Sequence, residues 1–195
     1  MNLPNKLTIA RIILAPFFMI LLLFDNMYLR YLATLIFIVA ALTDLYDGYL
    51  ARKTGVITGF GKFMDPLADK ILVSTAFISF VALGYVQTWM VLVIILREFL
   101  VTGFRTLAAY KGVVILPSYW AKWKTGCQMM VIIIMLVYVN LRSTLLPLGY
   151  DWNIFTTDWV FRVFDGMIFI TMLLTVGTGM DYLIKNAFLL KGVLK

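Results

Sequence analysis

The sequence predicts an all-α polytopic membrane protein, a bundle of six transmembrane helices with both termini in the cytoplasm. Hydrophobic residues make up 63% of the 195 residues, against roughly 45–50% in soluble domains. Apolar segments near the ~20 residues that a bilayer-spanning helix needs recur along the chain. No Gly/Ser/Pro-rich linker interrupts them, so we expect residues 1–195 to form one domain.

Turn-forming or charged residues bound the first three predicted spans. The first ends at the turn-like Asp25-Asn26. Because Arg11 interrupts its start and no A-x-A-like cleavage site follows, we predict an uncleaved helix and not a signal peptide. Pro66 fits the first turn of the third span, with Asp65 as its N-cap. These spans are expected over Leu7–Phe24, Leu29–Leu50 and Asp65–Tyr85.

Three further apolar segments complete the predicted bundle. The fifth span opens with Tyr119, Trp120 and Trp123, aromatic residues that suit a membrane–water interface. The last three spans are expected over Thr88–Tyr110, Tyr119–Leu141 and Trp159–Lys185.

The distribution of Lys and Arg predicts which side of the membrane each end occupies. Six spans place both termini on the same side. If that side is the inside, only Arg30, Arg142 and Arg162 of the 17 Lys and Arg residues fall outside. This excess of positive charge inside favours cytoplasmic termini in a multi-pass protein of the cell membrane.

The residue types exclude several kinds of chemistry. The single cysteine, Cys127, excludes an intrachain disulfide framework. The absence of histidine excludes Ser-His and Cys-His nucleophiles and imidazole-based metal sites. Carboxylates, Lys, Arg and hydroxyls must therefore carry any chemistry. The net charge of +7 is spread over several short loops, which favours attraction to anionic lipids and predicts no nucleic-acid binding.

Four aspartates stand where the second and third predicted spans meet, at Asp44, Asp47, Asp65 and Asp69. Helical spacing puts the first two on one face and the last two on a second stripe, and a short Gly-containing turn makes the two helices antiparallel neighbours. A carboxylate in the hydrocarbon region costs about 2.5–3.5 kcal/mol, so a cluster of four demands a cationic partner. Oxygen ligands select hard cations, which predicts two bound Mg²⁺ or Mn²⁺ ions suited to phosphoryl transfer.

Small residues are interleaved with these aspartates. Gly48, Ala51 and Gly61 leave room for a ligand to approach the acidic face closely. The alternative is that the aspartates are hydrated loop-facing residues and that the glycines serve helix packing. Four acids at both spacings favour the binding site.

The pattern Asp44-x2-Asp47-Gly48-x2-Ala51-Arg52-x8-Gly61-x3-Asp65-x3-Asp69 resembles the complete signature of the CDP-alcohol phosphotransferase family. Members of this family move a phosphatidyl-type group from a CDP-linked lipid to an alcohol and release CMP. The resemblance covers essentially the whole chain, since its length, span count and predicted topology also agree. It further implies a homodimer and an active site that faces the cytoplasm.

The resemblance implies a role for each motif residue. Asp44, Asp47 and Asp65 would hold one divalent ion, and Asp44, Asp65 and Asp69 the second. Asp69 would also be the general base that takes the proton from the attacking hydroxyl. The residues expected at the CDP-lipid are Gly48, Ala51, Arg52, Thr58 and Gly61. Of these, Thr58 lies outside the signature, and an ordinary loop position is the alternative.

Three other stretches bear on the acceptor alcohol. Thr8 and Arg11 follow one polar stripe into the first span, and Lys124 and Gln128 lie one turn apart in the fifth. Cationic groups in this region suit an acceptor that itself carries phosphate. The residues predicted to bind that phosphate are Thr8, Arg11, Arg105, Lys122, Lys124 and Gln128. Snorkelling to lipid headgroups is the alternative for the two lysines, and Arg97 is expected to pair with Glu98 or a neighbouring helix.

The segments PNKLTIAR, REFLVTGFR and KWKTGCQ resemble one branch of the family, the phosphatidylglycerophosphate synthases. That resemblance implies CDP-diacylglycerol as donor and sn-glycerol 3-phosphate as acceptor. The alternatives are a family member that makes cardiolipin, a phosphoinositol lipid or phosphatidylserine, and a divalent-cation transporter. Transporter sites normally lie near the bilayer midplane, whereas the apolar run from Tyr31 to Leu42 places Asp44 near one surface.

Overall fold

The computed structural model describes residues 3–54, 59–110, 119–149, 155 and 158–185. Within the helices, the side chains of residues 3–5, 45–54, 59–63, 110 and 119–122 lie outside that description. The described residues form helices and no strands, which confirms the all-α class. The helices are α1 (Leu3–Leu23), α2 (Met27–Thr54), α3 (Gly59–Ala82), α4 (Thr88–Tyr110), α5 (Tyr119–Leu145) and α7 (Trp159–Lys185).

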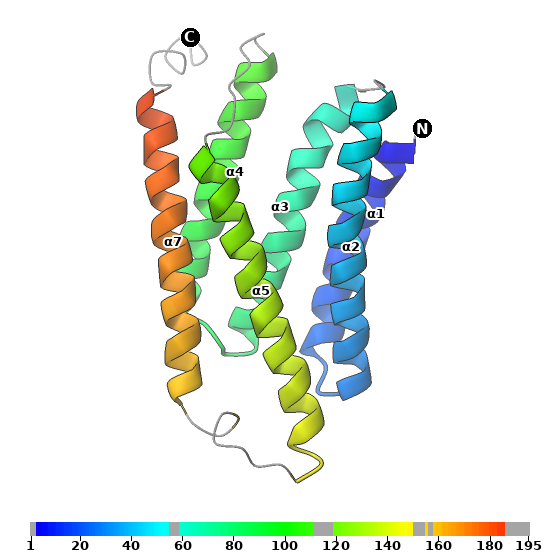
Figure 1. Cartoon of the computed structure of the whole chain (residues 1–195), viewed down its shortest axis with the longest axis vertical. Coiled ribbons are helices and arrows are strands. Elements are labelled where there is room, and N and C mark those ends of the chain that lie inside the picture. Colours follow the sequence, from blue (N-terminus) through cyan, green and yellow to red (C-terminus); the bar gives the residue numbers. More distant parts are fainter. Residues whose placement is uncertain (1–2, 55–58, 111–118, 150–154, 156–157, 186–195) are drawn as a thin grey trace.

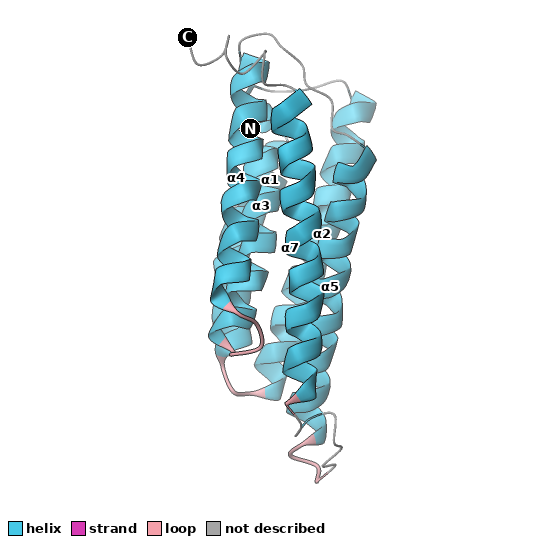
Figure 2. Cartoon of the chain, turned by 90° about the vertical axis from the view of Figure 1, so that its left-hand side faces the viewer, coloured by secondary structure: helices cyan, strands magenta, loops and turns pink. Residues whose placement is uncertain are grey.

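The helices run side by side along the long axis of the bundle (Figures 1 and 2). On one side of the bundle α1 packs against α2 and α3, and on the other α4 packs against α7. Contacts of α3 with α4 and of α5 with α2 and α7 join the two groups. The first turns of α1, α3 and α5 and the last turns of α2, α4 and α7 lie at one end of the bundle (Figure 1).

The predicted helix boundaries agree with the structure for α4 and α7, whereas α3 begins earlier than expected. The helix starts at Gly59, so Pro66 lies inside it and Asp65 is not its N-cap. A proline inside a helix removes one backbone hydrogen bond. The interhelical bond between Thr8 and Asp65 and the burial of Ala68 stabilise the turn around this proline.

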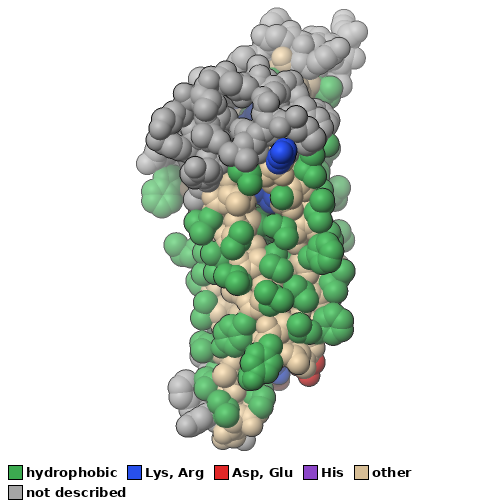
Figure 3. Space-filling view, turned by 90° about the vertical axis from the view of Figure 1, so that its right-hand side faces the viewer, with side chains coloured by type: hydrophobic (Ala, Val, Ile, Leu, Met, Phe, Trp, Pro, Cys, Tyr) green, Lys and Arg blue, Asp and Glu red, His purple; other side chains and the backbone are tan. Residues whose placement is uncertain are grey.

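Large apolar side chains cover the outside of the bundle as well as its core. Exposed Leu, Ile, Val, Phe and Met side chains occur on every helix, from Ile13 on α1 to Leu173 on α7. Figure 3 shows such side chains over the length of one face. An apolar exterior of this extent is expected where the solvent is lipid and not water.

Four helices of the described part are long and apolar enough to cross a membrane. These spans are Lys6–Leu23, Met27–Asp44, Trp123–Leu145 and Trp159–Lys185. The two other helices, α3 and α4, have similar lengths of 24 and 23 residues, but their charged residues lie nearer the middle, so that every stretch of 18 residues contains at least three of them. Much of that charge is turned inward, because Glu98 on α4 is buried and Lys70 on α3 is only 15% exposed.

Candidate active site

The first helix holds one aspartate of each neighbouring helix. Thr8 Oγ1 donates a hydrogen bond to Asp65 Oδ1 on α3 at 2.6 Å. Arg11 Nη1 lies 2.6 Å from Asp44 Oδ1 on α2, and its Nε donates to the carbonyl of Ala40 at 3.3 Å. Because residues three apart share a helix face, the two carboxylates lie beside the same turn of α1. The structure thus brings Asp44 and Asp65 together, as the spacing predicts.

Both α1 side chains are buried, although the acids they hold are not. Thr8 and Arg11 are 0% and 1% exposed, whereas the Asp44 side chain retains 37% exposure. A buried guanidinium is stable only when paired and hydrogen-bonded, and Asp44 and Ala40 supply those partners. In this structure Thr8 and Arg11 therefore support the aspartates, and their predicted contact with an acceptor phosphate stays a prediction.

Asp69 lies one helical turn beyond Asp65 on α3. Its Oδ2 accepts a hydrogen bond from Lys70 Nζ at 2.8 Å. The ammonium of Lys70 also lies 3.5 Å from Glu98 Oε2 on α4. Lys70 therefore joins the predicted general base to a second group of charges.

That second group is centred on Glu98 and is called here the Glu98 cluster; its members are Lys70, Arg97, Glu98, Lys124 and Gln128. Lys124 Nζ makes a short ion pair with Glu98 Oε1, and Arg97 Nη1 lies 3.1 Å from the same oxygen. Gln128 Nε2 donates to that oxygen at 3.4 Å and to Thr175 on α7 at 3.4 Å. Three cations thus surround one glutamate, so the cluster favours binding of a further anion.

The last helix completes the surroundings of Arg97. Arg97 Nη2 donates to Thr178 Oγ1 at 2.9 Å. A Cβ at Gly179 would lie 2.6 Å from Arg97 Nε, so a larger residue there would force the Arg97 side chain to shift. Thr175, Thr178 and Gly179 were not predicted as site residues. Their signal in the sequence is polar or small residues at helical spacing within an apolar span.

The other predicted residues fall into two groups. Arg105 on α4 lies over the ring of Tyr182 on α7, 6.0 Å from its centroid, and is not joined to the Glu98 cluster by any contact among the described side chains. The side chains of the remaining predicted residues lie outside the described part: Asp47, Gly48, Ala51, Arg52, Thr58, Gly61 and Lys122. Apart from Thr58, these residues lie on the described helices α2, α3 and α5.

The donor set fits divalent ions of the kind the motif implies. Asp44, Asp65 and Asp69 offer carboxylate oxygens at one end of the bundle, and hard cations such as Mg²⁺ prefer oxygen ligands. Among the described residues, Asp65 Oδ2 accepts no hydrogen bond from the protein. The described side chains alone contain no group of three or more potential ligands close enough to hold an ion.

The opposite end of the bundle is closed by hydrogen bonds and aromatic rings. Arg142 Nη1 on α5 donates to Tyr85 Oη at 2.9 Å, and Asn140 Nδ2 donates to Thr34 Oγ1 on α2 at 2.7 Å. The ring of Tyr85 stacks on Phe161 of α7 with centroids 5.7 Å apart. These contacts join α2, α5 and α7, and we call this region the tyrosine end and the other the aspartate end.

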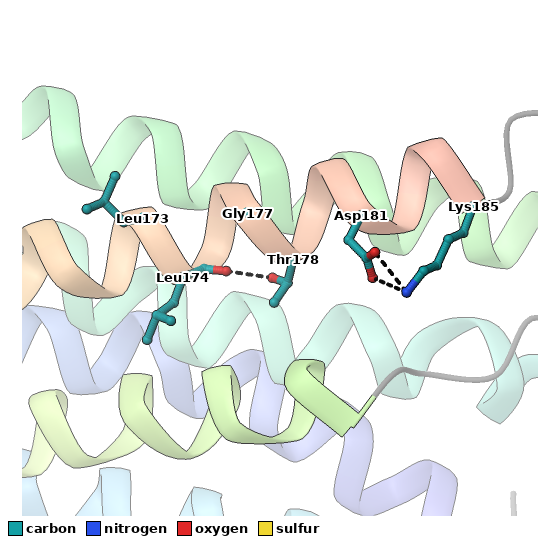
Figure 4. A pocket seen from close by; sticks show the side chains of 6 residues that line it. All are labelled: Leu173, Leu174, Gly177, Thr178, Asp181 and Lys185. Carbon is teal, nitrogen blue, oxygen red and sulfur yellow. Dashed lines mark hydrogen bonds and ion pairs between the residues drawn. The ribbon is translucent and has the colours of Figure 1, made fainter.

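A groove of about 420 Å³ runs along α7, lined by Leu173, Leu174, Gly177, Thr178, Asp181 and Lys185 (Figure 4). All of these residues belong to one helix. Asp181 and Lys185 pair with each other across the end of the groove at 2.8 Å. The groove contains none of the predicted site residues.

Comparison with known proteins relates the whole chain to one group of enzymes. A family model described as CDP-alcohol phosphatidyltransferase matches residues 1–176. A Bacillus subtilis protein named CDP-diacylglycerol–glycerol-3-phosphate 3-phosphatidyltransferase is 40% identical over 197 residues, with 95% of each chain covered. Proteins of the same name from Rickettsia bellii and Rickettsia typhi are 37% and 43% identical. The matches cover 93% of each chain for the first, and 70% of this chain and 76% of the relative for the second.

Proposed function

The chain belongs to the CDP-alcohol phosphatidyltransferase family, and from this membership we propose that it makes phosphatidylglycerophosphate. The substrates would be CDP-diacylglycerol and sn-glycerol 3-phosphate, which are the ones named for the relatives. The acceptor hydroxyl oxygen forms a bond to the phosphorus of the phosphatidyl group, the bond from that phosphorus to CMP breaks, and CMP leaves.

One observation carries the proposal from the family to this chain. Thr8 and Arg11, one turn apart on α1, hold Asp65 and Asp44 from two other helices. Two of the motif acids therefore lie beside the same turn of α1, held by residues that the motif itself does not contain. Buried partners on the protein side fix the carboxylates and leave about a third of the Asp44 side chain open to a ligand.

We further propose that Asp44, Asp47, Asp65 and Asp69 hold two divalent ions, Mg²⁺ or Mn²⁺. Bound ions of this kind stabilise the charge on the attacking and leaving oxygens of a phosphoryl transfer. Asp69 accepts the proton of the acceptor hydroxyl, for which its 32% exposed side chain is accessible. The CDP portion is assigned to Gly48, Ala51, Arg52, Thr58 and Gly61.

The excess positive charge of the Glu98 cluster supports a phosphate-bearing acceptor. Lys124 and Gln128 would approach the phosphate from α5, together with Lys122, while Arg105 would approach it from α4. Lys124 is 95% buried and already paired with Glu98. Its predicted role thus requires that it bind Glu98 and the acceptor phosphate at once, which an ammonium with three N–H donors can do.

For the membrane arrangement we propose six spans, with both termini and the aspartate end in the cytoplasm. The similar lengths of the six helices of the described part and their alignment with the long axis of the bundle support this topology (Figure 2). The family match argues against the transporter alternative. We expect a homodimer in the cell membrane.

The direct test is an assay of the purified protein in lipid vesicles with CDP-diacylglycerol, Mg²⁺ and radiolabelled glycerol 3-phosphate. We expect label in the lipid phase and release of CMP. Parallel reactions with labelled inositol phosphate, serine and phosphatidylglycerol test the other family members' acceptors. Label incorporated from one of those three, and none from glycerol 3-phosphate, would overturn the substrate assignment.

A further inference from the structure

Lys70 lies between two carboxylates that belong to different helices. Its ammonium is 2.8 Å from Asp69 Oδ2 on its own helix and 3.5 Å from Glu98 Oε2 on α4. The Lys70 side chain is 15% exposed, so this double contact is not a surface ion pair that water screens fully. The family motif ends at Asp69, and it does not include this lysine.

The contact with Asp69 requires a particular course of the lysine side chain. Consecutive residues on a helix point in different directions and do not face each other. The long Lys70 side chain must therefore turn toward its neighbour, and Glu98 Oε2 lies where it can hold the ammonium in that direction. Among the described residues, Lys70 is the only polar partner of the Asp69 carboxylate.

Glu98 is suited to act as the fixed point of this arrangement. It is 4% exposed, and its two oxygens are divided between neighbours. Oε1 receives Lys124, Arg97 and Gln128, whereas Oε2 faces Lys70. Contacts from two helices thus restrain the glutamate before Lys70 is considered.

We propose that Lys70 is a positioning residue that sets the direction of the Asp69 carboxylate, and that Glu98 holds Lys70 in place. The proposal rests on the assignment of Asp69 as general base under the proposed function. Lys70 occupies Oδ2 and thereby leaves Oδ1 for the divalent ion and the acceptor hydroxyl of the proposed function. Asp44 and Asp65 are held by buried residues of α1, and Lys70 with Glu98 supplies the equivalent support for Asp69.

The kinetic test compares Lys70→Met, Lys70→Arg and a matched surface control, Lys185→Met. Lys185 is 68% exposed and pairs with Asp181 on its own helix. A displacement of about 1 Å in a catalytic group can cost about 100-fold in rate. We expect Lys70→Met to lower kcat by about 100-fold with both KM values within about twofold. Lys70→Arg should recover at least a tenth of the wild-type kcat, and Lys185→Met should match the wild type.

Two kinetic outcomes would overturn the proposal. If Lys70→Met raises the KM for glycerol 3-phosphate and leaves kcat unchanged, Lys70 binds the acceptor and does not position the base. If kcat per folded molecule is unchanged while the unfolding temperature falls, Lys70 has a structural role only. An active wild type with an inactive Asp69→Asn variant upholds the proposed function under either outcome, so failure of the two proposals can be told apart.

A second measurement tests the contact itself without turnover. Unfolding temperatures of Asp69→Asn, Lys70→Met and the double variant are measured in metal-free enzyme. A direct pair predicts non-additivity, with the double variant shifted by less than the sum of the single shifts. A cycle of Glu98→Gln with Lys70→Met should likewise be non-additive. Additive shifts in the first cycle would show that Lys70 and Asp69 do not interact, and the proposal would fail.

Discussion

The two ends of the bundle are built from polar side chains in opposite ways. At the tyrosine end, Arg142 donates a hydrogen bond to Tyr85, and Asn140 donates one to Thr34 on another helix. At the aspartate end, buried cations and hydroxyls hold carboxylates that remain about one-third exposed, at 37% for Asp44 and 32% for Asp69. The first end ties helices together, and the second keeps charge available for a ligand.

This difference separates stability from function within one small fold. Hydrogen bonds between these side chains stabilise the bundle in an apolar surrounding, because they replace bonds to water. Among the described groups, Asn140 Oδ1 is buried without such a partner. Acids held close together repel one another until a cation binds. The aspartate end therefore contributes less to stability than its contacts alone would indicate. Substitutions there should lower activity more than stability, and substitutions at the tyrosine end should lower stability more than activity.

Removal of divalent ions should produce the largest difference between the two ends. After treatment with EDTA we expect activity to fall by about 1,000-fold or more, because several kcal/mol of transition-state stabilisation is lost. Addition of Mg²⁺ or Mn²⁺ should restore it. Calorimetry with CMP present measures ion uptake, and Asp44→Asn and Asp65→Asn should both reduce it. Undiminished activity in metal-free enzyme would contradict the ion site.

Asp69→Asn should come next, with a loss of about 10²- to 10⁴-fold in kcat, the usual contribution of a general base. The amide has nearly the same shape as the carboxylate, so binding of CDP-diacylglycerol should persist in a filter or calorimetric assay. Near-normal turnover would remove Asp69 from the role of base.

Arg11→Met tests the support behind the aspartates. The side chain is buried and binds Asp44, so its replacement removes one cation from that carboxylate and lets it shift. We expect a drop of about 10- to 100-fold in kcat. We also expect a loss of about 1–3 kcal/mol in stability, less than for a fully buried pair because Asp44 is partly solvated. Arg11→Lys should restore part of both. An unchanged kcat would show that Asp44 keeps its place without α1.

Tyr85→Phe at the tyrosine end should have the smallest effect on catalysis. It removes the hydroxyl that accepts the hydrogen bond of Arg142 and keeps the ring stack on Phe161. We expect a loss of about 1 kcal/mol in stability, measured as a lower unfolding temperature, with kcat unchanged. A large loss of activity would mean that the two ends are coupled and that their division of roles is wrong.

Local sequence patterns predicted the helices well where no competing signal intervened. Predominantly apolar segments gave the bounds of α4 and α7 as the structure has them. The start of α3 was predicted at Asp65, six residues late, because proline is favoured in a first turn. The Thr8–Asp65 hydrogen bond and the burial of Ala68, on either side of Pro66, outweigh that local preference. The sequence cannot predict these contacts, because they depend on how α1 packs against α3.

The candidate site likewise has features that the sequence predicted and features that only helix packing decided. The short turn between the second and third spans predicted that the two aspartate stripes would converge, and Thr8 and Arg11 were recognised as a polar stripe. Which partner each would bind was not predictable, since Thr8 lies 57 residues from Asp65 in the chain. Glu98 and Arg97 were expected to pair, but the convergence of α3 and α5 on Glu98, and of α7 on Arg97, depends on helix packing.

The sequence by itself determined that this chain enters a membrane as helices and carries an acidic motif near one membrane surface. Composition and helical periodicity are properties of residues that are close in the chain, and they do not depend on how the helices pack together. Only the tertiary structure decided that a threonine and an arginine hold two of the aspartates and that a lysine joins the third to Glu98. Those choices depend on distances of a few ångströms between separate helices, which packing sets and no local pattern contains.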